Sequence, residues 1–228
     1  VFDHVDEAII LEDDCIPTES FFFYCQELLE KYKYDERIAL VSGNNFTGFY
    51  DHKYSYTFSR YGFIWGWATW SRVWKQIDFS MQEWDKFKKE NGLRSRFDKY
   101  FPRKHWLDKF ELMYENYRNY GQLYGQHWDR KLNMHMHMNS QLSVIPNKNM
   151  VQNIGYGKYA ANCKTKSKFH EFEIKDIELP LIHPRYVYPN VCIDDKHEKL
   201  RFSGGMKSVA KNKIHKACPQ GLKNLIKK

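Results

Sequence analysis

The chain has 228 residues, of which 42% are hydrophobic, enough for one globular domain with a buried core, and this excludes an intrinsically disordered protein. Its formal net charge of +8 favours anionic partners such as phosphates, nucleic acid or acidic lipids, and aromatic residues make up 17% of it, more than a core requires. No stretch has the roughly 18 consecutive apolar residues of a membrane span, and the scattered cysteines form no CxxC pair, which argues against a zinc site and indicates a reducing, cytoplasmic compartment.

The first predicted element is a buried strand that ends in three acidic residues. Ala8 to Leu11 form a continuous apolar run, which is typical of a strand covered on both faces in a largely parallel sheet. Ligands bind at the carboxyl ends of strands in open α/β sheets, so Glu12, Asp13 and Asp14 indicate a site. A divalent cation would offset their mutual repulsion. The alternative is that these acids cap the helix that follows Pro17.

Helical and extended patterns alternate after the acidic residues. Apolar residues recur at helical spacing from Phe21 to Tyr32, and Thr18 is the expected N-cap of this helix. The run Ile38-Ala-Leu-Val41 predicts a second buried strand, which ends in Ser42-Gly43-Asn44-Asn45 near the same sheet edge as the acids. The mixture of aromatic and polar residues from Tyr54 to Phe58 is typical of an edge strand or hairpin.

The segment Phe63-Ile-Trp-Gly-Trp-Ala-Thr-Trp70 has the most unusual local composition of the chain. A tryptophan buries a large apolar ring, but its indole N–H requires a partner. Trp65, Trp67 and Trp70 therefore form either a part of the core or a platform for a sugar or nucleobase. The sequence leaves these two alternatives open.

The region from Arg72 to Arg118 is predicted to be helical. Arg72 to Lys89 is amphipathic, and charged and aromatic residues alternate from Lys86 to Arg118, with interruptions near Asn91-Gly92 and Pro102. Basic residues interleaved with aromatics can bind single-stranded nucleic acid. The helical spacing and the many acids of this region favour an ordinary solvated face instead, so we expect no nucleic-acid partner.

A further helix is predicted from Gly125 to Asn139. It contains Met134-His-Met-His-Met138, but histidines two residues apart diverge on a helix, so this pattern does not predict a metal site. Leu142-Ser-Val-Ile145 predicts a short strand that stops at Pro146-Asn147. Asn153-Ile-Gly-Tyr-Gly157 predicts a turn and lacks the pattern of a dinucleotide fingerprint.

The last part of the chain is polar and basic. The segment from Lys207 to Lys228 carries seven lysines and no acid, which predicts a frayed, solvated terminus. The alternative is a peripheral contact of this segment with an anionic membrane surface. We therefore divide the chain into a domain of residues 1–184 and a basic C-terminal extension of residues 185–228.

Several of these motifs, taken in order, resemble those of bacterial family 2 glycosyltransferases, which are nucleotide-diphospho-sugar transferases of the GT-A fold. The resemblance runs from about the first residue to Pro184, and the order of the motifs is more specific than any one of them. The motifs are Ile10-Leu-Glu-Asp-Asp-Cys-Ile-Pro17, Phe21-Phe22, Leu28-Leu29, Ser42-Gly43, Trp65-Gly-Trp-Ala-Thr-Trp70, Trp128-Asp129, Pro146-Asn147, Asn153-Ile-Gly-Tyr-Gly157 and Pro180-Leu-Ile-His-Pro184.

The resemblance implies an α/β, GT-A-like fold with a mixed, mainly parallel sheet flanked by helices. Family members begin with a βαβ half that recognises the nucleobase. Only a few residues precede the first predicted strand here, whereas a βαβ unit needs about 30, so we expect the domain to be N-terminally incomplete.

The resemblance also implies a metal-dependent, inverting transferase that moves a sugar from a nucleotide diphosphate to an acceptor hydroxyl in surface polysaccharide synthesis. Glu12-Asp13-Asp14 corresponds to the DxD-type motif of such enzymes. By this resemblance Asp14 ligates Mn²⁺ or Mg²⁺, while Asp13 and Glu12 lie by the ribose and the sugar. The acceptor would be a glycan or a lipid-linked sugar.

Asp129 matches the position at which the family places the base that takes a proton from the acceptor hydroxyl. The alternative is an acid that only stabilises the start of its helix. Trp65, Trp67 and Trp70 would shape the floor under the donor or acceptor sugar.

Two other functions stay open at this point. One is a metal-dependent phosphodiesterase that uses the acidic residues, but such a site needs further acids or histidines that the sequence does not cluster. The other is a carbohydrate-binding domain that kept the fold and lost turnover.

Overall fold

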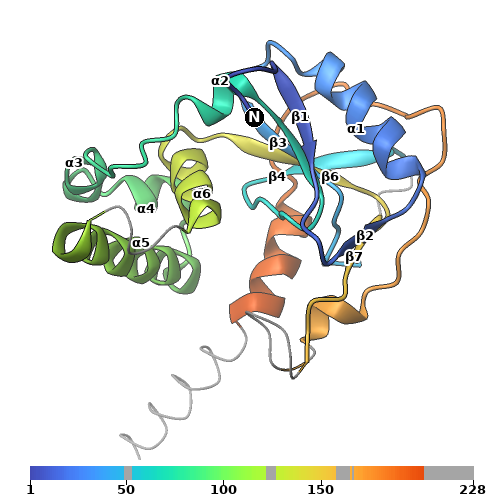
Figure 1. Cartoon of the computed structure of the whole chain (residues 1–228). Coiled ribbons are helices and arrows are strands. Elements are labelled where there is room, and N and C mark those ends of the chain that lie inside the picture. Colours follow the sequence, from blue (N-terminus) through green and yellow to red (C-terminus); the bar gives the residue numbers. More distant parts are fainter. Residues whose placement is uncertain (49–52, 122–126, 158–164, 166, 203–228) are drawn as a thin grey trace, which may run out of the picture.

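The structure, a computed structural model, describes residues 1–48, 53–121, 127–157, 165 and 167–202. The chain has a mixed α/β architecture, in which helices flank a five-stranded sheet and a separate two-stranded ribbon lies beside it (Figure 1). None of the helices described is both long and apolar enough to cross a membrane.

The five-stranded sheet is mostly antiparallel. Its strand order is β1-β5-β3-β6-β4, and β3 and β6 run parallel, whereas β1 with β5, β5 with β3, and β6 with β4 are antiparallel pairs. The prediction of a mainly parallel sheet is wrong, because an apolar run indicates that a strand is buried but not its direction. The strands are β1 (Glu7–Ile10), β3 (Ile38–Ser42), β4 (Tyr56–Ser59), β5 (Trp67–Trp70) and β6 (Leu142–Pro146), and the ribbon pairs β2 (Cys15–Pro17) with β7 (Val151–Asn153).

The strand β1 lies at an edge of this sheet, and all four of its residues are half-buried. The expectation that it is covered on both faces is therefore wrong, although Ile9 and Ile10 do pack against the core. The buried strand predicted at Ile38 is confirmed as β3, and the short strand predicted at Leu142 is confirmed as β6, which is also fully buried. The aromatic and polar segment before Ser59 is confirmed as the opposite edge strand, β4.

The helix α1 (Ser20–Lys31) buries the face that its spacing predicts. Phe21, Cys25 and Leu28 have no exposed surface, and the helix contacts β1, β3 and β5. The N-cap is Glu19 rather than the expected Thr18, and it makes no side-chain capping bond. The N–H of Ser20 donates instead to Asp176 Oδ1 at 3.0 Å, so a distant segment satisfies the start of the helix.

The helices α3, α4 and α5 form a group to one side of the sheet, with α6 between them and the strands (Figure 1). The break predicted at Asn91 is confirmed, because this residue has a φ of 55°. Pro102 lies in the first turn of α5, where no N–H is required, so the helix begins before it rather than stopping there. The segment from Arg72 to Lys89 contains two short helices rather than one. These helices are α2 (Ser71–Trp74), α3 (Trp84–Lys89), α4 (Gly92–Arg96), α5 (Tyr100–Tyr120) and α6 (Trp128–Met138).

Residues 191–202 form a further helix, drawn in orange-red in Figure 1, that packs against the domain. The fully buried carboxylate of Asp194 accepts hydrogen bonds from Ser59 Oγ at 2.6 Å and from Arg60 Nε at 2.7 Å. The packed part of the chain therefore continues past residue 184 to at least residue 202. The basic segment from Lys207 to Lys228 lies outside the described residues.

Candidate functional site

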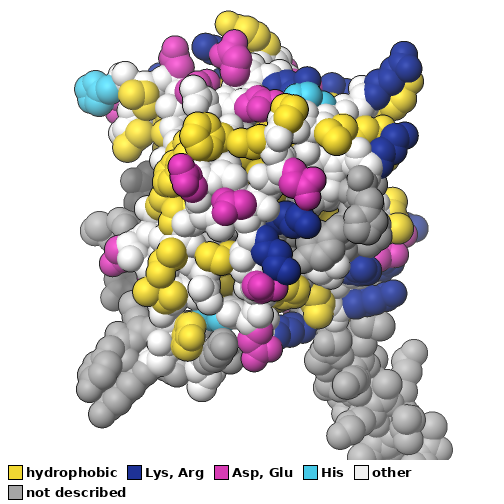
Figure 2. Space-filling view, turned by 90° about the vertical axis from the view of Figure 1, so that its right-hand side faces the viewer, with side chains coloured by type: hydrophobic (Ala, Val, Ile, Leu, Met, Phe, Trp, Pro, Cys, Tyr) yellow, Lys and Arg dark blue, Asp and Glu magenta, His cyan; other side chains and the backbone are white. Residues whose placement is uncertain are grey.

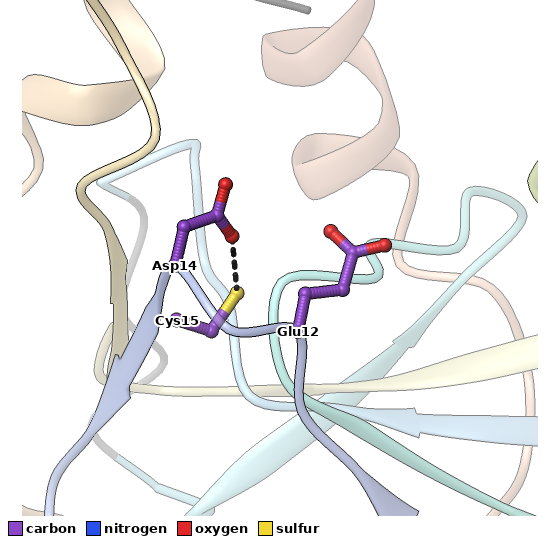
Figure 3. Close-up of side chains that lie close together, drawn as sticks. All are labelled: Glu12, Asp14 and Cys15. Carbon is purple, nitrogen blue, oxygen red and sulfur yellow. Dashed lines mark hydrogen bonds between the residues drawn. The ribbon is translucent and has the colours of Figure 1, made fainter. Parts of the chain in front are cut away.

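Two of the three predicted acids converge just after β1. A turn closed by the Cys15 N–H, which donates to Glu12 O at 3.1 Å, connects β1 to β2. One carboxylate oxygen each of Glu12 and Asp14, together with Cys15 Sγ, lie within 4.8 Å of one another. Figure 3 shows both carboxylates on the same side of this turn. Asp13, between them, is exposed and lies outside this group.

The carboxylate of Asp14 is held in place by the turn that follows β7. Asn153 Nδ2 donates to Asp14 Oδ1 at 2.8 Å, and the Ile154 N–H donates to the backbone oxygen of Asp14 at 2.8 Å. Gly155 lies so close that a Cβ at this position would be 1.8 Å from Asp14 Oδ2. Only glycine therefore leaves room for the carboxylate in this orientation.

The thiol of Cys15 supports Asp14 rather than adding a charge. Burial, followed by the negative charges of Asp14 and Glu12, raises the pKa of Cys15 to about 11. The neutral thiol donates to Asp14 Oδ1 at 3.6 Å (Figure 3). A protonated thiol is a poor metal ligand, whereas two carboxylates suit a hard cation such as Mg²⁺ or Mn²⁺ that takes its remaining ligands from water and phosphate.

The electrostatics of Glu12 connect this acidic pair to α6. Partial desolvation raises the pKa of Glu12 above its ordinary value, and the negative charges of Asp14, Asp129 and Asp13 raise it further. A bound cation would relieve this repulsion. Asp129, in the first turn of α6, is therefore close enough to act on the same region as the two carboxylates.

Asp129 borders a cavity with a volume of about 270 Å³. Trp65 lies in the wall of the same cavity, with its ring centroid 4.8 Å from that of His170 and 5.0 Å from that of Phe46. The structure thus brings the predicted base and one of the predicted tryptophans to one cavity, beside the acidic pair.

The other two tryptophans lie in the core. Trp70 is 2% exposed, and its indole Nε1 donates to Leu29 O at 3.0 Å, which assigns it to packing between β5 and α1. Trp67 is 1% exposed and stacks on Trp128 with ring centroids 5.4 Å apart. It borders an apolar groove of about 510 Å³, into which Glu12 also extends. Of the three, Trp65 is the half-buried one that borders the cavity beside Asp129.

The sequence analysis missed residues that the fold brings to the site from a distance. Asn153 and Gly155 were recognised as a turn, but nothing local connects them to Asp14. Lys109, Arg130 and Arg201 border the same cavity as Asp129, and they lie on three different helices. No short sequence pattern indicates that these three cations lie close together.

The histidine repeat of α6 does not contribute to the acidic pair. His135 and His137 are 6% and 1% exposed, and burial lowers the pKa of both, so they are neutral core residues. Within the described residues, Glu12, Asp14 and Cys15 form the one group with the geometry to hold a metal ion.

The sequence matches no family model, and no curated protein matches it either.

Proposed function

We propose that this chain is a metal-dependent glycosyltransferase that moves a sugar from a nucleotide diphosphate to an acceptor hydroxyl. The observation that carries the proposal is the convergence of Glu12 and Asp14 after β1, with Asp129 in the adjacent cavity. The motif order of the sequence supports the finer assignment to a GT-A-like enzyme of surface polysaccharide synthesis.

Asp14 and Glu12 would hold Mn²⁺ or Mg²⁺ together with oxygens of the donor's diphosphate. The cation supplies, when bound, positive charge that stabilises the departing diphosphate. Asn153, Gly155 and the Cys15 thiol keep the Asp14 carboxylate oriented for this role. Asp13, which is exposed beside the metal group, would contact the donor.

Asp129 takes the proton of the acceptor hydroxyl as that hydroxyl attacks the anomeric carbon. A single displacement of this kind inverts the anomeric configuration. Trp65 offers a flat apolar face on which the sugar can rest.

Two substitutions test these roles separately. We expect Asp14→Asn to abolish metal-dependent binding of UDP-sugars in calorimetric titration. We expect Asp129→Asn to preserve this binding and to remove sugar transfer. Asp6→Asn is the control, because Asp6 is an exposed acid just before β1, lies outside the metal group and bonds Ser71 through its backbone oxygen. Equal loss of nucleotide binding in the Asp14 and Asp129 variants would reject the assignment of roles.

The same titrations distinguish the other functions. Binding of plain glycans without any binding of UDP-sugars would identify a carbohydrate-binding domain rather than a transferase. Mn²⁺-dependent cleavage of a simple phosphodiester, without sugar transfer, would identify a phosphodiesterase.

A further inference from the structure

The cavity beside Asp129 is assembled from several separate parts of the chain, and Phe46 and Phe169 also line it. α5 contributes His105, Trp106 and Lys109, and α6 contributes Asp129 and Arg130. The helix of residues 191–202 contributes His197 and Arg201, and the segment between β4 and β5 contributes Trp65. The cavity therefore depends on the tertiary packing of these segments.

Unpaired positive charge is concentrated in this cavity. Lys109, Arg130 and Arg201 form no salt bridge within the part of the chain that the structure describes, and Asp129 is the one acid among the lining residues described. Lys104, by contrast, lies on the same helix as Lys109 and pairs with Asp108 at 2.9 Å. A cluster of unpaired cations in a recess creates a field that attracts an anion.

This concentration of charge does not simply follow from the basic composition of the chain. On the face of the molecule seen in Figure 2, lysine and arginine side chains are interspersed with aspartate and glutamate, and neither sign dominates. The cavity has three cations to one carboxylate. Its charge is therefore a local feature of the fold.

The cavity wall also has polar atoms without partners. Trp106 is 5% exposed and His197 is 1% exposed, yet Trp106 Nε1 and His197 Nδ1 have no hydrogen-bond partner within the described residues. Burial, followed by the charge of Arg201, lowers the pKa of His197 to about 3 and that of His105 to about 4. Both imidazoles are neutral, and buried polar groups of this kind are ordinarily satisfied by a ligand or by water.

Aromatic surfaces complete the cavity. Trp65 borders it on one side, and Trp106 borders it on another with the Arg201 guanidinium 5.6 Å from its ring centroid. Aromatic faces suit the apolar side of a sugar ring. A neutral sugar would use these surfaces and leave the three cations unmatched.

We propose that the acceptor sugar that enters this cavity carries an anionic group, a phosphate or a carboxylate, which Lys109, Arg130 and Arg201 bind. The sugar ring then rests on Trp65, and the hydroxyl to be glycosylated faces Asp129. This inference rests on the proposed function, because it takes Asp129 as the base. It adds the chemical class of the acceptor, which is an anionic glycan.

The test is calorimetric titration of the whole chain with glucose 6-phosphate, glucuronate and glucose, without metal or nucleotide. We expect the two anionic probes to bind at least about tenfold more tightly than glucose. Arg201→Gln and Lys109→Gln should each weaken the anionic probes by on the order of tenfold and leave glucose unchanged. The relative affinity of the two anionic probes then shows which group the cavity prefers.

Arg103→Gln is the matched control, because Arg103 lies on the same helix as Lys109, borders a different recess and has no salt bridge in the described part of the chain. Thermal unfolding of each variant verifies that it is folded. Equal affinity for glucose and the anionic probes, or an equal loss in the Arg103 variant, would overturn the proposal. It would also be overturned if UDP without metal displaced the anionic probes, since the cavity would then serve the donor.

This experiment is independent of the test of Asp14. Loss of the proposed metal role would appear in the titrations of UDP-sugars with Mn²⁺, whereas the anionic probes are titrated without metal. The two proposals can therefore fail separately.

Discussion

The substitution Gly155→Ala moves the Asp14 carboxylate without removing it. The added Cβ would lie 1.8 Å from Asp14 Oδ2, 2.7 Å from its Cγ and 3.0 Å from its Cβ, and Cβ contacts below 3.0 Å are essentially not seen in proteins. The carboxylate oxygen must therefore move by about 1.2 Å, the difference between these distances. The φ of Gly155 lies outside the left-handed region, so the backbone accepts alanine without strain.

This displacement breaks the hydrogen bond from Asn153 Nδ2 to Asp14 Oδ1, which measures 2.8 Å. A hydrogen bond to a carboxylate contributes about 1.5 to 3 kcal/mol to the free energy of unfolding, which is less than the roughly 5 to 15 kcal/mol that stabilises a typical domain, so we expect the fold to survive the change. Loss of a group that orients a metal ligand typically weakens metal affinity by about 10-fold to 100-fold, or roughly 1.4 to 2.8 kcal/mol. We therefore expect Mn²⁺ affinity to fall about 10-fold to 100-fold in a variant that remains folded.

The assay is calorimetric titration of Mn²⁺ in the presence of UDP, with thermal unfolding measured on the same samples. Ile154→Ala is the control, because Ile154 belongs to the same turn, is 51% exposed and keeps its backbone bond to Asp14. We expect this variant to bind as the parent does. Unchanged Mn²⁺ affinity in Gly155→Ala would refute the reasoning, since the position of the Asp14 carboxylate would then be irrelevant to binding.

Three further predictions concern buried charge and pH. Asp194→Ala leaves the Arg60 guanidinium without its 2.7 Å partner, and we expect urea unfolding to show a loss of about 3 kcal/mol in the free energy of unfolding. The pKa of His197 is lowered to about 3 by burial, so stability falls as the pH drops below the unfolded value of about 6.5. From pH 7 to pH 5 this residue should contribute a loss of roughly 2 kcal/mol in urea unfolding, and His197→Gln should reduce that difference. The raised pKa of Glu12 means that protonation competes with Mn²⁺ at a higher pH than for an ordinary glutamate. The Mn²⁺ affinity measured by titration should therefore fall as the pH falls toward 5. The fall should be smaller in Glu12→Gln.

Sequence patterns were a better guide to the burial of segments than to the pairing of strands. The runs at Ile38 and Leu142 gave fully buried strands, and the spacing from Phe21 gave the buried face of α1. These features depend on side chains within one segment. The direction of β5 and the edge position of β1 depend on residues about 60 positions apart, such as Ile10 and Trp67, and no periodicity within either segment encodes them.

The acidic pair was predictable because its members are two residues apart in sequence, and the turn from Glu12 to Cys15 brings their carboxylates together. The tryptophans were not assignable from composition, because Trp70 and Trp65 have the same side chain but only Trp65 borders the cavity. The cations of the cavity come from three helices, so only the tertiary packing of these helices joins them.

The antiparallel pairing of β1 and β5 is what joins the acids to the tryptophan segment. Ile10 lies opposite Trp67, so the end of β1 and the start of β5 coincide at one edge of the sheet. Residues 11–14 and 63–66 must leave the sheet together at this edge, and a Cβ on Gly66 would lie 3.1 Å from Leu11 Cδ2. The end of β3 reaches the same place, because the Gly43 N–H donates to Gly66 O at 2.8 Å. The end of β3 therefore lies near the acids, as the sequence predicted. A parallel β1–β5 pair would place Trp65 at the opposite end of the sheet from Glu12, so the strand direction that the sequence did not reveal determines the composition of the site.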